Sequence, residues 1–169
     1  MMSKIGAFKA SLLKLTKERA KQGIPPLPLN KDQVTDLCSI IKKNDFSSED
    51  GKFLKHQLMH RVMPGVDETS YIKAQLLNEI CSDNIYSSII NKQEAIRILG
   101  TMQGGYNVNI LTQLLDDLEY QQDAYLQLKN TILIFDSFHD IEEKYKKGNI
   151  YAEKLLYSWS QGEWFRNKK

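Results

Sequence analysis

Leu-Gly-Thr-Met-Gln-Gly-Gly-Tyr-Asn, at residues 99–107, marks a joint between two helices. Leu99 ends one apolar helical pattern, and Asn107 is placed to cap the helix that follows. Gly104 and Gly105 favour backbone angles with positive φ, which other residues adopt only at a cost in free energy. We therefore expect a tight turn here with a helix on either side.

Apolar residues recur at helical spacing from this joint back to the N-terminus. The pattern predicts helices that begin near Ile5, Asn30, Ser48, Asp67 and Asn91. Gln33 and Glu94 follow their cap residues by three positions, which is the spacing of a capping box. The side chains expected to face inward include Phe8, Leu12, Val34, Leu37, Cys38, Ile41, Leu54, Leu58, Tyr71, Ala74, Leu77 (or Leu76) and Cys81.

Three further helical patterns follow the joint, and the middle one is the most apolar. We expect that helix to be buried between neighbours, because apolar residues occur on more than one of its faces. One face carries Ala124, Leu128, Thr131, Ile132 and Phe135. Gly148 then stops a segment, and Asn149 caps the last helix. Seven to nine helices with short turns and no strand predict an all-α bundle or short solenoid.

Composition points to one globular domain of 169 residues, with 41% hydrophobic and 26% charged residues. The net charge of +2 is too small to imply nucleic acid by itself, but its distribution is uneven. Residues 1–30 hold six basic side chains and one acidic, and residues 116–143 hold one basic and eight acidic. No apolar stretch is long enough to span a bilayer, and lysines interrupt any signal-peptide core, so we expect a cytoplasmic chain.

The candidate chemical sites are weak when each is weighed against its structural interpretation. His56 and His60 are four residues apart and could share one helix face, but two ligands do not close a metal site. Cys38 and Cys81 lie in apolar helical contexts, which favours buried, reduced thiols. Adjacent carboxylates such as Asp116 and Asp117 point about 100° apart on a helix, so a solvated face or pairing with the basic ends is favoured. The residues form no catalytic, metal or cofactor site, and catalysis by the chain itself is the least favoured hypothesis.

Five segments in order resemble the N-terminal HEAT-like domain of aconitase B, the bacterial bifunctional aconitate hydratase 2 (2-methylisocitrate dehydratase). The resemblance covers nearly the whole chain and rests on Gly23–Leu29, Arg61–Glu68, Leu99–Asn107, Phe135–Asp140 with Glu142–Lys144 and Gly148–Asn149, and Ser158–Trp159 with Glu163–Phe165.

This resemblance implies a right-handed HEAT-like superhelix of about seven to nine antiparallel helices, forming one domain over residues 1–169. In the family, the [4Fe-4S] cluster and the catalytic residues lie in later domains, so the resemblance implies no cofactor and no catalytic residue in this chain. Nothing follows Lys169, so we expect the accessory domain without the enzyme, either excised from it or encoded alone.

Two functions remain open. The family suggests a protein-interaction domain that docks on aconitase catalytic domains or on a second copy of itself, and its candidate contacts beside the turns are Val66, Met102 and Tyr106. Local packing of the turns is the alternative for these three residues. The second hypothesis is a regulatory module that binds mRNA through its basic first helix, with candidate contacts Lys9, Lys14, Lys17 and Lys21.

Overall fold

The computed structural model describes residues 4–131, 134 and 137–162, apart from the side chains of Lys14 and Leu15. This part of the chain folds into nine α-helices and one short 3-10 helix, with no strand, which confirms the predicted all-α, HEAT-like class. The helices form two compact units, Met1–Asn91 and Lys92–Lys169, each described by itself below. The prediction of a single domain stays a prediction.

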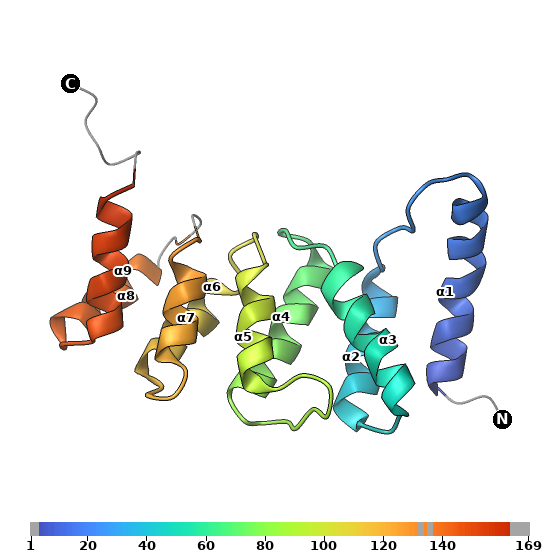
Figure 1. Ribbon diagram of the computed structural model, residues 1–169, viewed down its shortest axis with the longest axis horizontal. Coiled ribbons are helices and arrows are strands. Elements are labelled where there is room, and N and C mark those ends of the chain that lie inside the picture. The colour runs from blue at the N-terminus through green and yellow to red at the C-terminus, as the bar shows by residue number, and fades with distance from the viewer. Residues whose placement is uncertain (1–3, 132–133, 135–136, 163–169) are drawn as a thin grey trace. The chain divides into compact units, whose positions relative to one another are not determined.

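Unit 1 contains four helices that run in alternating directions (Figure 1). These are α1 (Lys4–Lys21), α2 (Lys31–Lys43), α3 (Ser48–His60) and α4 (Glu68–Cys81). Helix α2 contacts each of the other three, so its apolar residues form the centre of the unit. Val34, Leu37 and Ile41 of α2 are fully buried there.

Local capping explains where the helices of unit 1 begin. The Asn30 side chain accepts a hydrogen bond from the Gln33 N–H, and the Gln33 side chain accepts one from the Asn30 N–H, at 2.9 and 3.0 Å. This pair confirms the first predicted capping box. Asp67 caps α4 by accepting a hydrogen bond of 2.7 Å from the Thr69 N–H. Each cap satisfies a backbone donor that the helix itself leaves without a partner.

The prediction for the buried face of α4 is wrong for Tyr71, and it did not include Lys73. Tyr71 is 47% exposed, whereas Ala74, Leu77 and Cys81 are buried as expected. Lys73 is buried instead and only 1% exposed. Positions 73, 77 and 80 lie on one side of a helix with 3.6 residues per turn, and α4 buries that side.

Unit 2 begins with α5 (Lys92–Gly100), directly after Asn91. It continues with α6 (Val108–Gln113), the 3-10 helix η1 (Leu114–Asp116), α7 (Gln121–Leu128), α8 (Ser137–Lys146) and α9 (Ile150–Ser160). Helix α7 contacts α5, α6 and α9, and its Ala124 and Leu128 are fully buried.

The helix predicted through residues 124–135 ends earlier, at Leu128. Thr131 is not helical, and Ile132 and Phe135 lie outside the described residues. The Thr131 hydroxyl donates to the Gln127 carbonyl at 3.2 Å, and the Thr131 N–H donates to the Leu128 carbonyl. Such local bonds give the backbone an alternative to a continued helix. Leu126 of α7 is exposed, so the expectation of a helix buried on several faces is also wrong.

The last helix begins as predicted. Gly148 has a φ of +88°, and the Asn149 side chain accepts hydrogen bonds from the N–H groups of Tyr151 and Ala152, at 3.0 and 2.9 Å. Ala152, Leu155 and Trp159 form the buried face of α9.

Candidate functional site

The two turns at one edge of unit 1 are joined by hydrogen bonds. The Arg61 Nε donates to the Leu27 carbonyl at 2.9 Å, and the Leu29 N–H donates to the Arg61 carbonyl at 2.7 Å. These bonds connect residues that are more than thirty positions apart in the sequence. The turn after α1 and the turn after α3 therefore form one connected surface.

Further bonds hold the second of these turns. The Ser70 hydroxyl donates to the Met63 carbonyl, and the Asp67 carboxylate accepts from both the hydroxyl and the N–H of Thr69. The hydrogen bond from the Thr69 side chain, followed by that from its backbone, lowers the pKa of Asp67 from its ordinary value. The turn keeps Val66 74% exposed, and Met63 and Leu27 are exposed as well. We refer to Leu27, Met63 and Val66 as the unit 1 turn patch.

The joint at residues 99–107 differs in two respects from the sequence prediction. Gly105 has the expected positive φ, +89°, but Gly104 is not among the positive-φ residues. Asn107 stands at the start of α6 but makes no side-chain capping bond. Its amide nitrogen instead donates backward to the carbonyl oxygens of Leu99 and Met102, at 2.8 and 3.3 Å. Asn107 thus closes the turn rather than starting the helix.

The three candidate protein contacts are placed differently from one another. Met102 is only 4% exposed, so the prediction that it forms an exposed contact is wrong. Its burial matches the alternative of local turn packing, and the bond from Asn107 holds its carbonyl in the turn. Tyr106 is 37% exposed in unit 2, and Val66 is exposed in unit 1.

The candidate RNA contacts on α1 do not form one uniform group. The Lys9 ammonium pairs with Asp50 of α3 and lies 5.2 Å from the centre of the Phe53 ring. Hydrogen bonds from Lys9 and then from Ser47 lower the pKa of Asp50. Lys17 and Lys21 are exposed, whereas the Lys14 side chain lies outside the described residues.

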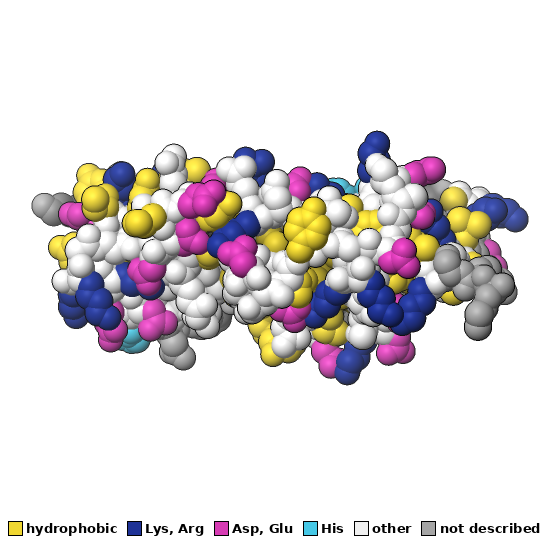
Figure 2. All heavy atoms as spheres, turned by 90° about the horizontal axis from the view of Figure 1, so that it is seen from below, with side chains coloured by type: hydrophobic (Ala, Val, Ile, Leu, Met, Phe, Trp, Pro, Cys, Tyr) yellow, Lys and Arg dark blue, Asp and Glu magenta, His cyan; other side chains and the backbone are white. Residues whose placement is uncertain are grey.

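Basic and acidic side chains are intermixed on the face of each unit that Figure 2 shows, rather than gathered by sign. In unit 2, Lys144 pairs with Asp116, and Lys92 pairs with Asp117 at 3.0 Å. Burial by itself would raise the pKa of Asp117. The hydrogen bonds from Lys92 and from backbone N–H groups together have the larger effect, so the net pKa lies below its ordinary value. These pairs support the interpretation that acidic residues serve as partners for basic ones.

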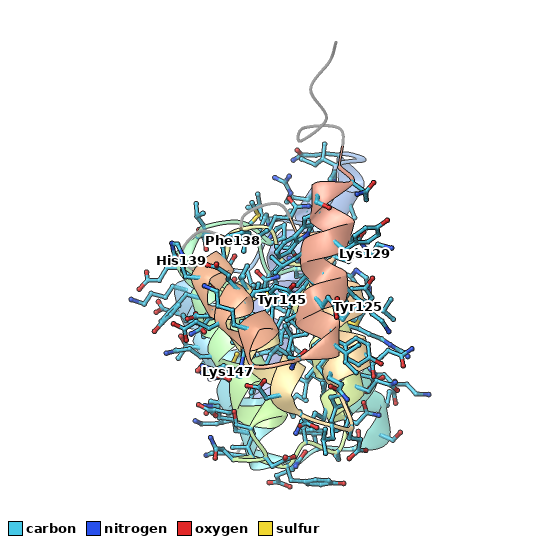
Figure 3. The ribbon with its side chains drawn as sticks, turned by 90° about the vertical axis from the view of Figure 1, so that its left-hand side faces the viewer. Tyr125, Lys129, Phe138, His139, Tyr145 and Lys147 are labelled. Carbon is cyan, nitrogen blue, oxygen red and sulfur yellow. The ribbon has the colours of Figure 1, made fainter. Side chains whose placement is uncertain are left out.

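The end of unit 2 formed by α8 and α9 carries aromatic and basic side chains (Figure 3). Phe138 and His139 lie at the start of α8, and Lys147 lies just after its end. The rings of Tyr125 and Tyr151 lie 5.7 Å apart, and the Lys154 ammonium lies 4.9 Å from the centre of the Tyr151 ring. Trp164 and Phe165, which follow α9 in the sequence, lie outside the described residues.

The cysteines do not fit an iron–sulfur cluster. The chain holds two, Cys38 and Cys81, whereas such a cluster is bound by several cysteine thiolates. Both are free thiols and buried, and burial raises the pKa of Cys38 to about 12. The rings of His56 and His60 lie 4.7 Å apart, but within the described ranges no three His, Cys, Asp or Glu residues are grouped as a metal site would require. No described helix is both long and apolar enough to cross a membrane.

Comparison with known proteins gives consistent matches. The family described as the aconitate B N-terminal domain matches residues 12–165. Aconitate hydratase B of Pseudomonas aeruginosa is 47% identical over 155 residues, covering 92% of this chain and 18% of that protein. The enzyme of the same name from Escherichia coli is 43% identical over 151 residues, covering 89% and 17%. That from Helicobacter pylori is 39% identical over 164 residues, covering 96% and 18%.

The chain thus spans less than a fifth of the length of these relatives. The match includes both units, and it covers the turns at Arg61–Glu68 and Leu99–Asn107 from which the candidate site is built. The chain belongs to the aconitate B N-terminal domain family.

Proposed function

We propose that this chain is a non-catalytic protein-interaction domain of an aconitate hydratase B, acting in the cytoplasm. It docks on the catalytic domains, which isomerise citrate and isocitrate in the full-length enzyme, or it associates with a second copy of itself. The proposal rests on family membership together with one surface feature, the unit 1 turn patch.

The turn patch supports a contact with protein because its apolar side chains stand on a turn surface held by hydrogen bonds. Single exposed apolar residues are normal on any protein surface. Here Leu27, Met63 and Val66 share two turns that Arg61 joins, so a partner can bind them with little ordering of the backbone.

Sedimentation velocity tests the proposal. The chain is run alone over a range of concentrations, and then with Pseudomonas aeruginosa aconitate hydratase B that lacks its matching N-terminal part. We expect either a concentration-dependent dimer or a complex with the shortened enzyme. A strict monomer that also fails to bind the shortened enzyme would contradict the proposal.

A variant pair locates the contact. Val66→Asp places a charge in the turn patch, where burial against a partner would leave that charge without a counter-ion. We expect the dissociation constant to rise at least about tenfold, which is 1.4 kcal/mol. The control is Tyr86→Ser, which removes a side chain of similar exposure from another segment of unit 1 and should leave association unchanged.

The second candidate function is RNA binding through α1. Positions 14, 17 and 21 fall on one side of α1, opposite Ile5, Phe8 and Leu12, which are buried. If RNA binds there, changing Lys14, Lys17 and Lys21 to Gln should weaken binding and reduce the slope of log K against log salt by about 2. Fluorescence anisotropy with a labelled single-stranded RNA measures both quantities.

Lys9→Gln serves as the comparison in this experiment. Because Lys9 pairs with Asp50, we expect its loss to change the packing of α1 more than RNA affinity. No binding by the unchanged chain at low salt, or binding that survives the triple substitution, would contradict this function for α1.

A further inference from the structure

Two exposed histidines lie side by side in the last turn of α3. His56 and His60 are four residues apart in this helix, which runs unbroken from Ser48 to His60. Residues at that spacing are neighbours on one side of a helix. Leu54 and Leu58 are fully buried on a different side of α3, so the packing of the helix leaves both imidazole rings exposed to solvent.

The distance between the two rings matches that of a pair bound to one metal ion. An imidazole nitrogen lies about 2.0–2.1 Å from a bound Zn²⁺, which puts the centre of the ring about 3.2 Å from the ion. Two rings that meet at the ion with an angle of about 90–109° then have centres about 4.5–5.2 Å apart. The ring centres of His56 and His60 lie 4.7 Å apart.

The two side chains can reach one ion without a change in the helix. The ring atoms that face the ion are selected by χ2, a torsion that has broad minima in histidine. Both side chains are exposed, so each ring can turn a nitrogen toward a common point. Because the backbone of α3 already sets the separation of His56 and His60, binding orders only two side chains.

The residues around the pair indicate which cations it can bind. Lys55 and Arg61 adjoin the two histidines, and Lys52 lies one turn before His56. Mg²⁺ and Ca²⁺ bind through oxygen ligands such as carboxylates, whereas imidazole suits Ni²⁺, Cu²⁺ and Zn²⁺. A pair of neutral nitrogen ligands among basic residues therefore favours a transition-metal ion over Mg²⁺ or Ca²⁺.

We propose that His56 and His60 chelate a divalent transition-metal ion of the class of Ni²⁺, Cu²⁺ and Zn²⁺. In the described ranges no third His, Cys, Asp or Glu joins the pair, so the site is open and water fills the other coordination positions. The inference is independent of the proposed function, because it requires only α3 of a single full chain.

Calorimetric titration of the full chain with Ni²⁺ tests the chelate. The chain has three histidines, and the third, His139, is exposed on α8 of unit 2. We expect one Ni²⁺ per chain to bind more tightly than any further ion. His56→Gln and His60→Gln should each raise the dissociation constant of this ion at least about tenfold, because each leaves a single imidazole. His139→Gln is the matched control and should leave the constant unchanged.

Electron paramagnetic resonance with Cu²⁺ counts the ligands directly. At one Cu²⁺ per chain we expect nitrogen couplings from two imidazoles, and from one imidazole in either single variant. Cu²⁺ should also bind more tightly than Ni²⁺, as nitrogen ligands generally prefer.

A second variant separates spacing from any other effect of the substitutions. Lys52 is exposed and lies four residues before His56, so Lys52→His together with His60→Gln places an equivalent pair one turn earlier. We expect this double variant to regain the affinity that His60→Gln alone loses.

Three results would overturn the inference. Equal effects of all three single histidine substitutions would mean that the imidazoles bind ions independently. A double variant that stays as weak as His60→Gln would show that helical spacing does not create the site. Displacement of Ni²⁺ by an equal concentration of Mg²⁺ would assign the ion to oxygen ligands instead.

Discussion

Lys73 lies on the buried side of α4, four residues before Leu77. Its side chain is only 1% exposed, so the ammonium group is largely removed from water. This burial lowers the pKa of Lys73 to about 8 from an ordinary value of 10.5. The stability of unit 1 must therefore depend on pH.

The direction of this dependence follows from proton binding. Between pH 8 and 10.5 the unfolded chain binds more protons at Lys73 than the folded chain, so the free energy of unfolding rises with pH over that window. Cys38 acts in the opposite direction, because burial raises its pKa to about 12 from 9.0 and its contribution falls between pH 9 and 12. We expect stability to rise from pH 8 to 9 and then to level off, as measured by urea unfolding.

Lys73→Met removes the buried charge and keeps a long apolar side chain. At pH 7 we expect it to raise the free energy of unfolding by about 1–3 kcal/mol, and the rise between pH 8 and 9 should disappear. The control is Lys42→Met, which removes the ion pair of 2.6 Å with Glu79 at the surface and should change stability by less than about 1 kcal/mol. Equal effects of the two substitutions would show that burial of Lys73 carries no penalty.

Among the helices, the start of α9 combines a cap with a contact to another element. The Asn149 Oδ1 accepts from two N–H groups of α9, while the Asn149 Nδ2 donates to the Leu115 carbonyl of η1 at 2.7 Å. One side chain therefore both starts a helix and attaches it to a preceding element. Asn30, in contrast, caps α2 through a purely local pair with Gln33.

This difference predicts unequal costs for two alanine substitutions. Asn30→Ala should lower the free energy of unfolding by about 0.5–2 kcal/mol, which is the usual cost of a lost cap. Asn149→Ala should cost roughly 1 kcal/mol more, because it also leaves the Leu115 carbonyl without its donor. Urea unfolding followed by circular dichroism compares the two variants. An equal or smaller loss for Asn149→Ala would mean that its bond to Leu115 contributes nothing to stability.

For the molecule as a whole, the activity to expect depends on how many cysteines could bind an iron–sulfur cluster. The chain has two cysteines, and both are buried in unit 1 as free thiols. Its relatives are five to six times longer, since the chain covers 17–18% of those compared.

We expect the isolated chain to show no turnover of citrate or isocitrate, even after treatment with iron and sulfide under reducing conditions. A coupled assay against a no-protein sample measures this, and the intact Pseudomonas aeruginosa relative is the positive control. Turnover above the no-protein rate would contradict the non-catalytic role.

Much of the helical structure could be predicted from the sequence, because helix starts depend on residues close together along the chain. Asn30, Asp67 and Asn149 all cap helices where the spacing predicted. Each of these three cap bonds spans only two or three residues, so the residues that form it are close together in the sequence. Two predictions fail: α7 ends earlier than expected, at Leu128, and Asn107 makes no capping bond although it stands at the start of α6.

The candidate site was decided by tertiary structure. Lys9 pairs with Asp50, which is 41 residues away in the sequence. Met102 is buried, although its place in a turn is equally compatible with an exposed side chain. Helical spacing says which residues share a side of a helix, but not what the neighbouring elements place against that side. The sequence by itself therefore determined most of the helix starts, the caps at Asn30, Asp67 and Asn149, and the family. Only the packing of distant residues decided that Lys73 is buried and that Lys9 is paired with Asp50.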